Sequence, residues 1–451
     1  MLCLTQLIYN IFRCSFWREL LMLVDQHNLK VTGENQDAIV AYDDTINAYL
    51  ALSQKTGPKL KHLLSLDPNM IMAQCLKGYF YVLMGNQELL LKAQLLCKSV
   101  MDANKQVTDR EKLHLQALWK WCNDDDWGAI RSWEEILLKY PNDILALRLS
   151  HHGHFYTGDS DAMCKSIETV MPSWNESCPG FGFVLGMRAF AHEENFNFSF
   201  AEEQGRRAVD LNPFDPWAIH SVLHVMEMQD LHEEGLLWIK GVEPYWTGAN
   251  NFRYHLWWHR ALLHLDRSEF KEVLRLYDEE IWDPDSDEYL DFCNDSSILK
   301  RLEICGVDVG ERWIPLADKI RPRIKEHVRT FSDIHFVIAL TAVNDWDSAE
   351  ELIKTFSIKG GEIRMDIGIH LCQAIVDYHK GDHSAAFLKM IELKDKIFSI
   401  GGSNAQRDLF SQILIDTAIK SGNFIEAEEL LLSRLDMFPN DTLTKKRINL
   451  L

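Results

Sequence analysis

The fold is decided by the stretch LHLQALWKWCNDDDWGAIRSWEEILLKYP, residues 113–141. In it Ala117 and Ala129 stand twelve residues apart, each among larger apolar residues, with the polar run NDDD between them. Two antiparallel helices can cross closely where small side chains meet. Pro141 then ends the second helix, because proline has no backbone N–H and its ring clashes with the preceding turn. The stretch therefore predicts one helix–turn–helix unit.

The same pattern recurs further along the chain. Positions repeated at 72-residue steps are Leu113, Leu185 and Trp257; Ala117, Ala189 and Ala261; and Ala129, Ala201 and Val273. The helix-ending prolines Pro141, Pro213 and Pro284 follow at steps of 72 and 71 residues. A tetratricopeptide repeat is about 34 residues long, so each step spans two repeats. The sequence predicts an all-α solenoid of tetratricopeptide-like helix–turn–helix repeats, wound into a right-handed superhelix.

Four regions are expected along the 451 residues. They are an apolar or amphipathic segment at 1–35, N-terminal repeats at 36–285, an irregular helical connection at 286–330 and C-terminal repeats at 331–451. Repeats are predicted near 70–102, 110–143, 144–178, 182–215, 216–250 and 254–287. Alternating strand patterns bounded by turns are almost absent, which predicts no sheet.

Residues 1–24 are rich in apolar side chains, but Arg13, Arg18 and Glu19 interrupt the run. A membrane-spanning helix needs about 18 or more apolar residues with few or no charges. An amphipathic helix is therefore favoured here over a signal sequence or an anchor. No other segment is predicted to span a membrane.

The chain is strongly acidic, with 47 Lys and Arg against 67 Asp and Glu and a formal charge of −20. Such a chain is repelled by phosphate backbones and anionic lipids, which argues against nucleic acid as a partner. The ten Cys form no C-x-x-C pair, and several lie in apolar helical patterns. They are typical of buried thiols in a reducing compartment, so a cytoplasmic location is expected.

Two histidine pairs are the main candidates for a site. His220 and His224 are four residues apart, as are His255 and His259, and the pairs lie 35 residues apart. Residues at i and i+4 share one helix face. Because the pairs are one repeat apart, their helices should stack about 10 Å apart, and the four imidazoles should converge on the concave surface. Groups so close disfavour joint protonation, so their pKa values should fall.

Other candidates surround the histidines. Glu227 lies one helical turn beyond His224, Glu194 and His151 belong to earlier first helices, and Trp258 is expected to face the groove. Imidazoles with a carboxylate can bind a transition metal such as zinc, or supply acid–base groups near neutral pH. The alternative is that these histidines fill gaps between helices. No H-E-x-x-H, nucleotide-binding loop or G-x-S-x-G motif is present.

The second candidate is the loop GGSNAQRD, residues 401–408. Its glycines allow unusual backbone angles, and Ser403 or Asn404 can cap the helix that follows. A helix N-terminus next to Arg407 can also hold an anion. Candidate ligand contacts in this loop are Asn404, Gln406, Arg407 and Asp408. Arg407 and Asp408 are expected to reach across the superhelix to the histidines.

Several segments together resemble one family. They are HSVLHVMEM (220–228), HLWWHRAL (255–262), GVDVGERW (306–313), SDIHF (332–336) and GGSNAQRDLF (401–410). With them the chain, from about residue 36 onward, is similar to the tetratricopeptide repeat protein 38 family. The resemblance implies helical repeats and a soluble location, and supplies no reaction.

The favoured function is a binding module that takes a peptide or a small ligand on its concave face, with no cofactor and no catalysis. This rests on analogy with other helical repeat folds. The alternative is a metal-binding protein or enzyme that uses His220, His224, His255 and His259. A third possibility is a scaffold with partners on the convex face, and no oligomeric state follows from the sequence.

Overall fold

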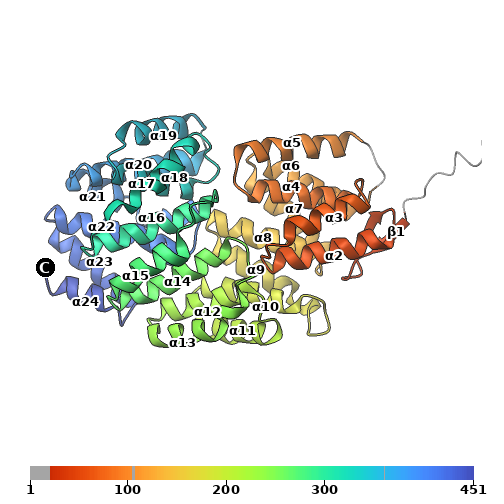
Figure 1. Cartoon of the computed structure of the whole chain (residues 1–451), viewed down its shortest axis with the longest axis horizontal. Helices are drawn as coiled ribbons and strands as arrows, with labels where there is room; N and C mark the ends of the chain where they lie inside the picture. The colour runs from red at the N-terminus through yellow and green to blue at the C-terminus, as the bar shows by residue number, and fades with distance from the viewer. Residues whose placement is uncertain (1–20, 104–106, 360) are drawn as a thin grey trace, which may run out of the picture.

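The computed structural model describes residues 21–103, 107–359 and 361–451, and most of them are helical (Figure 1). The predicted all-α class is confirmed. The helices follow one another as antiparallel pairs, with α2–α7 at one end of the molecule, α17–α24 at the other, and α8–α14 between them. No helix among these residues has the length and apolar character that crossing a bilayer would require.

The helix bounds are as follows. The first part of the chain contains α2 (Gln36–Leu50), α3 (Thr56–Leu66), α4 (Ile71–Leu83), α5 (Gln87–Asp102), α6 (Asp109–Trp121), α7 (Asp126–Lys139), α8 (Ile144–Thr157), α9 (Ser160–Val170), α10 (Phe181–Glu193), α11 (Phe198–Leu211), α12 (Pro216–Met228), α13 (His232–Val242), α14 (Phe252–Asp266) and α15 (Phe270–Leu276). The second part contains α16 (Tyr289–Ile304), α17 (Trp313–Ile320), α18 (Thr330–Ala342), α19 (Trp346–Lys359), α20 (Ile369–His379), α21 (His383–Ile391), α22 (Asn404–Lys420), α23 (Phe424–Met437) and α24 (Thr442–Ile448).

Small residues lie where paired helices cross. The repeated positions Ala117, Ala129, Ala189, Ala201, Ala261 and Val273 are all fully buried. Gly205 shows how tight the packing of α11 is, because a Cβ placed there would lie 3.5 Å from the Ala189 Cβ and 2.7 Å from Val222 Cγ2. The small side chains therefore set the distance between neighbouring helices, as ridge-into-groove packing requires.

The polar turns predicted between helices act as caps. The side chain of Asp125, from the run NDDD, accepts a hydrogen bond from the Gly128 N–H and begins α7. Asp143 and Asp215 begin α8 and α12 in the same way. Each carboxylate satisfies an N–H group that the first helical turn leaves without a partner.

A short β-hairpin precedes the helices, so the expectation of no sheet is wrong at this point. Strands β1 (Leu21–Val24) and β2 (Lys30–Gly33) pair in antiparallel register, while the remainder of the expected amphipathic helix, residues 1–20, lies outside the described residues. Glu111 of α6 accepts hydrogen bonds from the Thr32 N–H at 2.9 Å and the Thr32 hydroxyl at 2.7 Å. This partner lies 79 residues away, so a local sequence pattern does not reveal it.

The superhelix closes on itself instead of leaving an open concave face. The Asn250 N–H donates to the Leu52 carbonyl at 2.6 Å, which joins the turn after α2 to the loop before α14. Arg323 donates to the Gly85 carbonyl at 2.9 Å across 238 residues. In addition, α22 packs against both α12 and α16. The C-terminal repeats therefore fill the interior that an open solenoid would expose to solvent.

We expect the variant Ala189→Phe to lower the free energy of unfolding by about 1–3 kcal/mol, because a phenyl ring overpacks the crossing of α10 and α11. Chemical denaturation followed by circular dichroism measures this change. Glu203→Phe is the control, since Glu203 is exposed on α11. Equal effects of the two variants would show that the crossing is not tightly packed.

Candidate functional site

The four histidines meet on two neighbouring helices. His220 and His224 project from α12, and His255 and His259 from α14. The Nε2 atoms of His220 and His255 lie 3.1 Å apart, and those of His259 and His255 lie 3.3 Å apart. One ring nitrogen from each of the four lies within 4.8 Å of the others. We call these four residues the histidine cluster.

The cluster is buried, which corrects the expectation of an open surface. His224 and His259 have no exposed area, and His220 and His255 are 2% and 3% exposed. The cause is the closure of the superhelix, since α16 packs on α14 and α22 packs on α12. The spacing of the histidines predicted that they converge, whereas only the long-range packing determines their burial.

Carboxylates and one amide surround the cluster. His259 Nδ1–H donates to Glu227 at 2.7 Å, and His255 Nδ1–H donates to the Asn294 side-chain oxygen at 2.9 Å. His224 Nδ1 lies 3.2 Å from Glu193 Oε2 and 3.9 Å from Glu194 Oε1.

Sequence reasoning missed two of these surrounding residues, Glu193 and Asn294. Glu193 is a charged residue on the otherwise apolar face of α10, and that position was the available signal. Asn294 lies on α16, a regular helix inside the region 286–330 that was expected to be irregular.

Burial controls the charges at this site. Desolvation lowers the pKa of all four imidazoles, and that of His220, His255 and His259 falls well below the usual value. The neighbouring imidazoles lower the pKa of His220 further. The predicted fall is therefore present, with burial as its larger cause. Burial also raises the pKa of the surrounding carboxyls, to about 7 for Glu194 and Glu227.

Trp258 is a core residue, which corrects its predicted place in the groove. It has no exposed area, and its ring stacks on His255 with centroids 5.1 Å apart and planes 13° apart. The Arg301 guanidinium of α16 lies 5.5 Å from the same ring. Because α16 covers this face of α14, the neighbouring Trp257 is the half-buried one of the pair and packs against Trp246.

The loop 401–408 packs against the N-terminal repeats. A Cβ on Gly401 would lie 2.6 Å from the Tyr156 carbonyl oxygen, and its φ of +84° also favours glycine. Ser403 and Gln406 form a capping box at the start of α22. The glycines therefore allow a close approach of two backbones, and the cap orients the helix that follows.

The start of α22 reaches the edge of the cluster through one carboxylate. The Asn404 N–H donates to Glu194 Oε1 at 3.0 Å, and Arg407 Nη2 lies 3.5 Å from Glu194 Oε2. Asp408 instead forms ion pairs with Arg434 and, at 3.9 Å, with Arg301 of α16. The predicted reach across the superhelix is thus made by Asn404 and Arg407, and not by Asp408.

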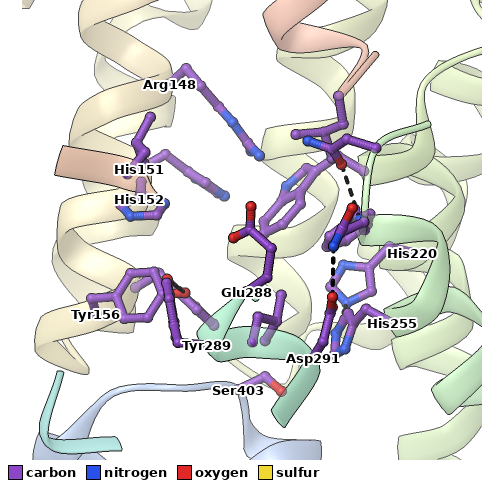
Figure 2. A pocket seen from close by; sticks show the side chains of 18 of the residues that line it. Arg148, His151, His152, Tyr156, His220, His255, Glu288, Tyr289, Asp291 and Ser403 are labelled. Atoms are coloured by element: carbon purple, nitrogen blue, oxygen red, sulfur yellow. Dashed lines mark hydrogen bonds between the residues drawn. The ribbon is translucent and has the colours of Figure 1, made fainter. Parts of the chain in front are cut away.

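A cavity of about 220 Å³ lies beside the cluster and shares His220 and His255 with it (Figure 2). Its walls come from helices and loops spread over most of the chain. The lining residues are Tyr49, Leu52, Leu83, Arg148, His151, His152, Phe155, Tyr156, Trp217, His220, Asn250, Asn251, Phe252, His255, Glu288, Tyr289, Leu290, Asp291, Ser403 and Gln406. The closed superhelix therefore encloses a mixed aromatic and polar chamber.

One wall of the cavity is rich in nitrogen donors. Arg148 reaches from α8 into the cavity, as Figure 2 shows, and its guanidinium lies 4.1 Å from the centre of the Trp217 ring. Arg148 hydrogen-bonds to the Tyr49 hydroxyl and interacts with the buried carboxyl of Asp215, although it forms no close ion pair with a carboxylate among the described residues. In the same part of the structure, the buried Nε2 atoms of His151 and His152 have no hydrogen-bond partner. Two imidazole nitrogens without a hydrogen-bond partner and one guanidinium thus line the cavity.

Acidic and phenolic groups also line the cavity. The Glu288 carboxylate points into the cavity in Figure 2, and burial raises its pKa. Asp291 accepts a hydrogen bond from Asn251 at 2.7 Å, and burial raises its pKa to about 7. The hydroxyls of Tyr156 and Tyr289 lie 2.8 Å apart. The cavity lining therefore combines cationic, acidic and phenolic groups.

The structure places the predicted residues in three groups. The first group lines the cavity and contains His151, His220, His255 and Gln406. The second group lies at the cluster and contains Glu194, His224, Glu227 and His259. The third group packs outside the cavity and contains Trp258, Asn404, Arg407 and Asp408. Arg148 was missed, although it is the one charged residue in the stretch ILALRLS (144–150), which was the available signal.

Comparison with known proteins adds little to this description. No protein-family model matches the chain. One solved structure that it resembles is that of Naa15/Naa10 bound to HypK-THB, at 12% identity, with 89% of this chain and 63% of that chain covered. The TM-score is 0.20, which is too low to transfer an arrangement or a function. The fold and the site themselves define a protein of tetratricopeptide-like helical repeats, closed around a polar interior.

We expect Glu194→Ala to lower the free energy of unfolding by about 1–3 kcal/mol, because it leaves the buried N–H of Asn404 without an acceptor. Glu194→Gln keeps an acceptor oxygen and should cost less. Urea denaturation of both variants beside Glu203→Ala, an exposed control, measures the difference. A loss no larger than that of the control would show that this contact does not stabilise the closure.

Proposed function

We propose that this chain is a binding protein that holds a small ligand with an oxyanion group, a carboxylate or a phosphate, in the cavity between α8, α12, α14 and α16. The observation that carries the proposal is Arg148, a buried guanidinium in the cavity wall whose neighbours are the Tyr49 hydroxyl and the Asp215 carboxyl, and which forms no close ion pair among the described residues. A buried charge is costly unless it is paired. A bound oxyanion would supply the missing partner.

The chemistry of the wall favours an oxyanion over other ligands. A guanidinium presents several N–H groups in a planar fork that matches carboxylate and phosphate oxygens. The neutral imidazoles of His151 and His152 can donate further hydrogen bonds from their unpartnered Nε2 atoms. The largely buried position of these groups strengthens each of these bonds.

The remaining walls define the rest of the ligand. Trp217, Phe155 and Phe252 offer aromatic faces to an apolar portion. Glu288 also points into the cavity, so a hydroxyl or amino group beside it would find an acceptor. A volume of about 220 Å³ suits a metabolite-sized molecule better than an extended peptide. A cavity of this volume could accommodate only the terminal residue of a peptide.

We also propose membership of the tetratricopeptide repeat protein 38 family. Several of the segments that carry the resemblance gather around this interior: two form α12 and α14, and two others meet where His335 packs on Phe410 with ring centroids 5.4 Å apart. In this proposal the protein is a cytoplasmic binding module and not an enzyme, and its formal charge of −20 disfavours nucleic acid.

The test of the ligand proposal is a thermal-shift screen of the full chain against small carboxylates and phosphates, with calorimetry of the compounds that raise the melting temperature. We expect Arg148→Met to weaken binding of those compounds at least about tenfold, since a charge-assisted hydrogen bond contributes about 1.5–3 kcal/mol. Arg131→Met is the matched control, because Arg131 is exposed. Unchanged affinity in Arg148→Met, or a screen in which only uncharged compounds bind, would contradict the proposal.

A further inference from the structure

We propose that His220, His224, His255 and His259 bind one transition-metal cation, of which Zn²⁺ fits best. This inference goes beyond the ligand cavity and does not depend on it. The carrying observation is the convergence of four imidazole nitrogens within 4.8 Å of one another, in a place closed to solvent.

The distances suit a tetrahedral ion. Zinc binds imidazole nitrogen at about 2.0–2.1 Å, so two nitrogens on one tetrahedral zinc lie about 3.3 Å apart. In the cluster the Nε2 atoms of His259 and His255 are 3.3 Å apart, and those of His220 and His255 are 3.1 Å apart. The remaining nitrogens, which lie within 4.8 Å of one another, would have to move closer together to complete such a site.

The outer hydrogen bonds fix which nitrogens are free. An amide oxygen only accepts, so His255 Nδ1 carries the proton that it donates to Asn294 at 2.9 Å. When Glu227 is ionised, His259 Nδ1 likewise donates to it at 2.7 Å. In their neutral forms both rings therefore direct an Nε2 lone pair toward the other. Metal-bound histidines typically have this arrangement, with the second nitrogen donating to a carboxylate or a carbonyl group.

Two facing lone pairs 3.3 Å apart repel each other unless a cation lies between them. A divalent cation would bind both lone pairs at once. It therefore resolves a conflict that the hydrogen-bond pattern alone leaves in place.

The surrounding charge also fits a cation. Glu193 is fully buried, and within the described part of the chain neither of its carboxylate oxygens has a hydrogen-bond partner. Its Oε2 lies 3.2 Å from His224 Nδ1, and Glu194 and Glu227 are close to the same ring. Four neutral imidazoles leave the full charge of a divalent ion uncompensated. These carboxylates would balance it.

The donor set selects the kind of metal. Calcium and magnesium require oxygen ligands, whereas imidazole suits zinc, copper, nickel and iron. Zinc accepts a tetrahedral arrangement without a preference imposed by its d electrons. Because His220 and His255 also line the cavity, the ion would lie in the cavity wall.

The direct test uses the full chain produced without a histidine tag. The protein is stripped with a chelator and titrated with Zn²⁺ against a competing dye, and then with Co²⁺ while the visible spectrum is recorded. We expect one ion per chain, the intense absorption of tetrahedral cobalt, and a higher melting temperature with zinc. Binding of well below one equivalent, or an octahedral cobalt spectrum, would overturn the proposal.

Variants locate the site. The double variant His224→Gln with His259→Gln should lose stoichiometric zinc binding, while His335→Gln, a buried histidine outside the cluster, should keep it. Should the double variant not fold, Asn294→Ala removes only the outer hydrogen bond and should weaken zinc binding about 10–100-fold. Zinc binding that is unchanged in Asn294→Ala, or lost equally in His335→Gln, would overturn the assignment.

Arg148→Met separates the two proposals. It should lose oxyanion binding and keep zinc, because Arg148 belongs to the cavity wall and not to the cluster. A wild-type chain that binds zinc but no oxyanion would overturn only the proposed function. A chain that binds an oxyanion but no zinc would overturn only this inference.

Discussion

The carboxylate of Glu194 joins two parts of the chain that are 210 residues apart, and the rest of the interior depends on this contact. Glu194 is the residue that ends α10, and its carboxylate accepts a hydrogen bond from the first N–H of α22. Repeats in an open solenoid touch only their neighbours. Here α22 enters the space that the N-terminal repeats surround. Burial of the histidine cluster, enclosure of the cavity and the raised pKa of the nearby carboxyls all follow from that insertion.

The helical repeats could be predicted because their signals are local. One stretch of about 30 residues contains the small residues Ala117 and Ala129, the polar run before α7 and the proline after it. Each of these features has a direct physical meaning. The convergence of the histidines was predictable for the same reason, since i, i+4 spacing on adjacent repeats fixes their relative positions.

What could not be predicted depends on contacts between distant segments. The hairpin at 21–33 is held by Glu111, and α16 buries Asp291, Asn294 and Asp295 against helices from earlier repeats. A polar composition of this kind suggests an irregular connection when only the local pattern is considered. Trp258 was placed in the groove because the helix that covers it begins about 30 residues later. Arg148 was missed because only the packing of distant helices shows that its guanidinium faces a cavity.

The lining of the cavity runs from Tyr49 to Gln406, which has a consequence for the order of folding. Repeat proteins commonly fold from neighbouring units outward, so α2–α14 can form pairs while the ribosome is still producing the remainder. The chamber cannot exist at that stage, because its last wall is made by the start of α22. Contacts across 200 or more residues form late, since closing so long a loop costs entropy before any contact offsets it. During this interval the polar and aromatic side chains of the interior are open to water. The nascent protein therefore passes through an unclosed form whose inner surface the finished protein never shows.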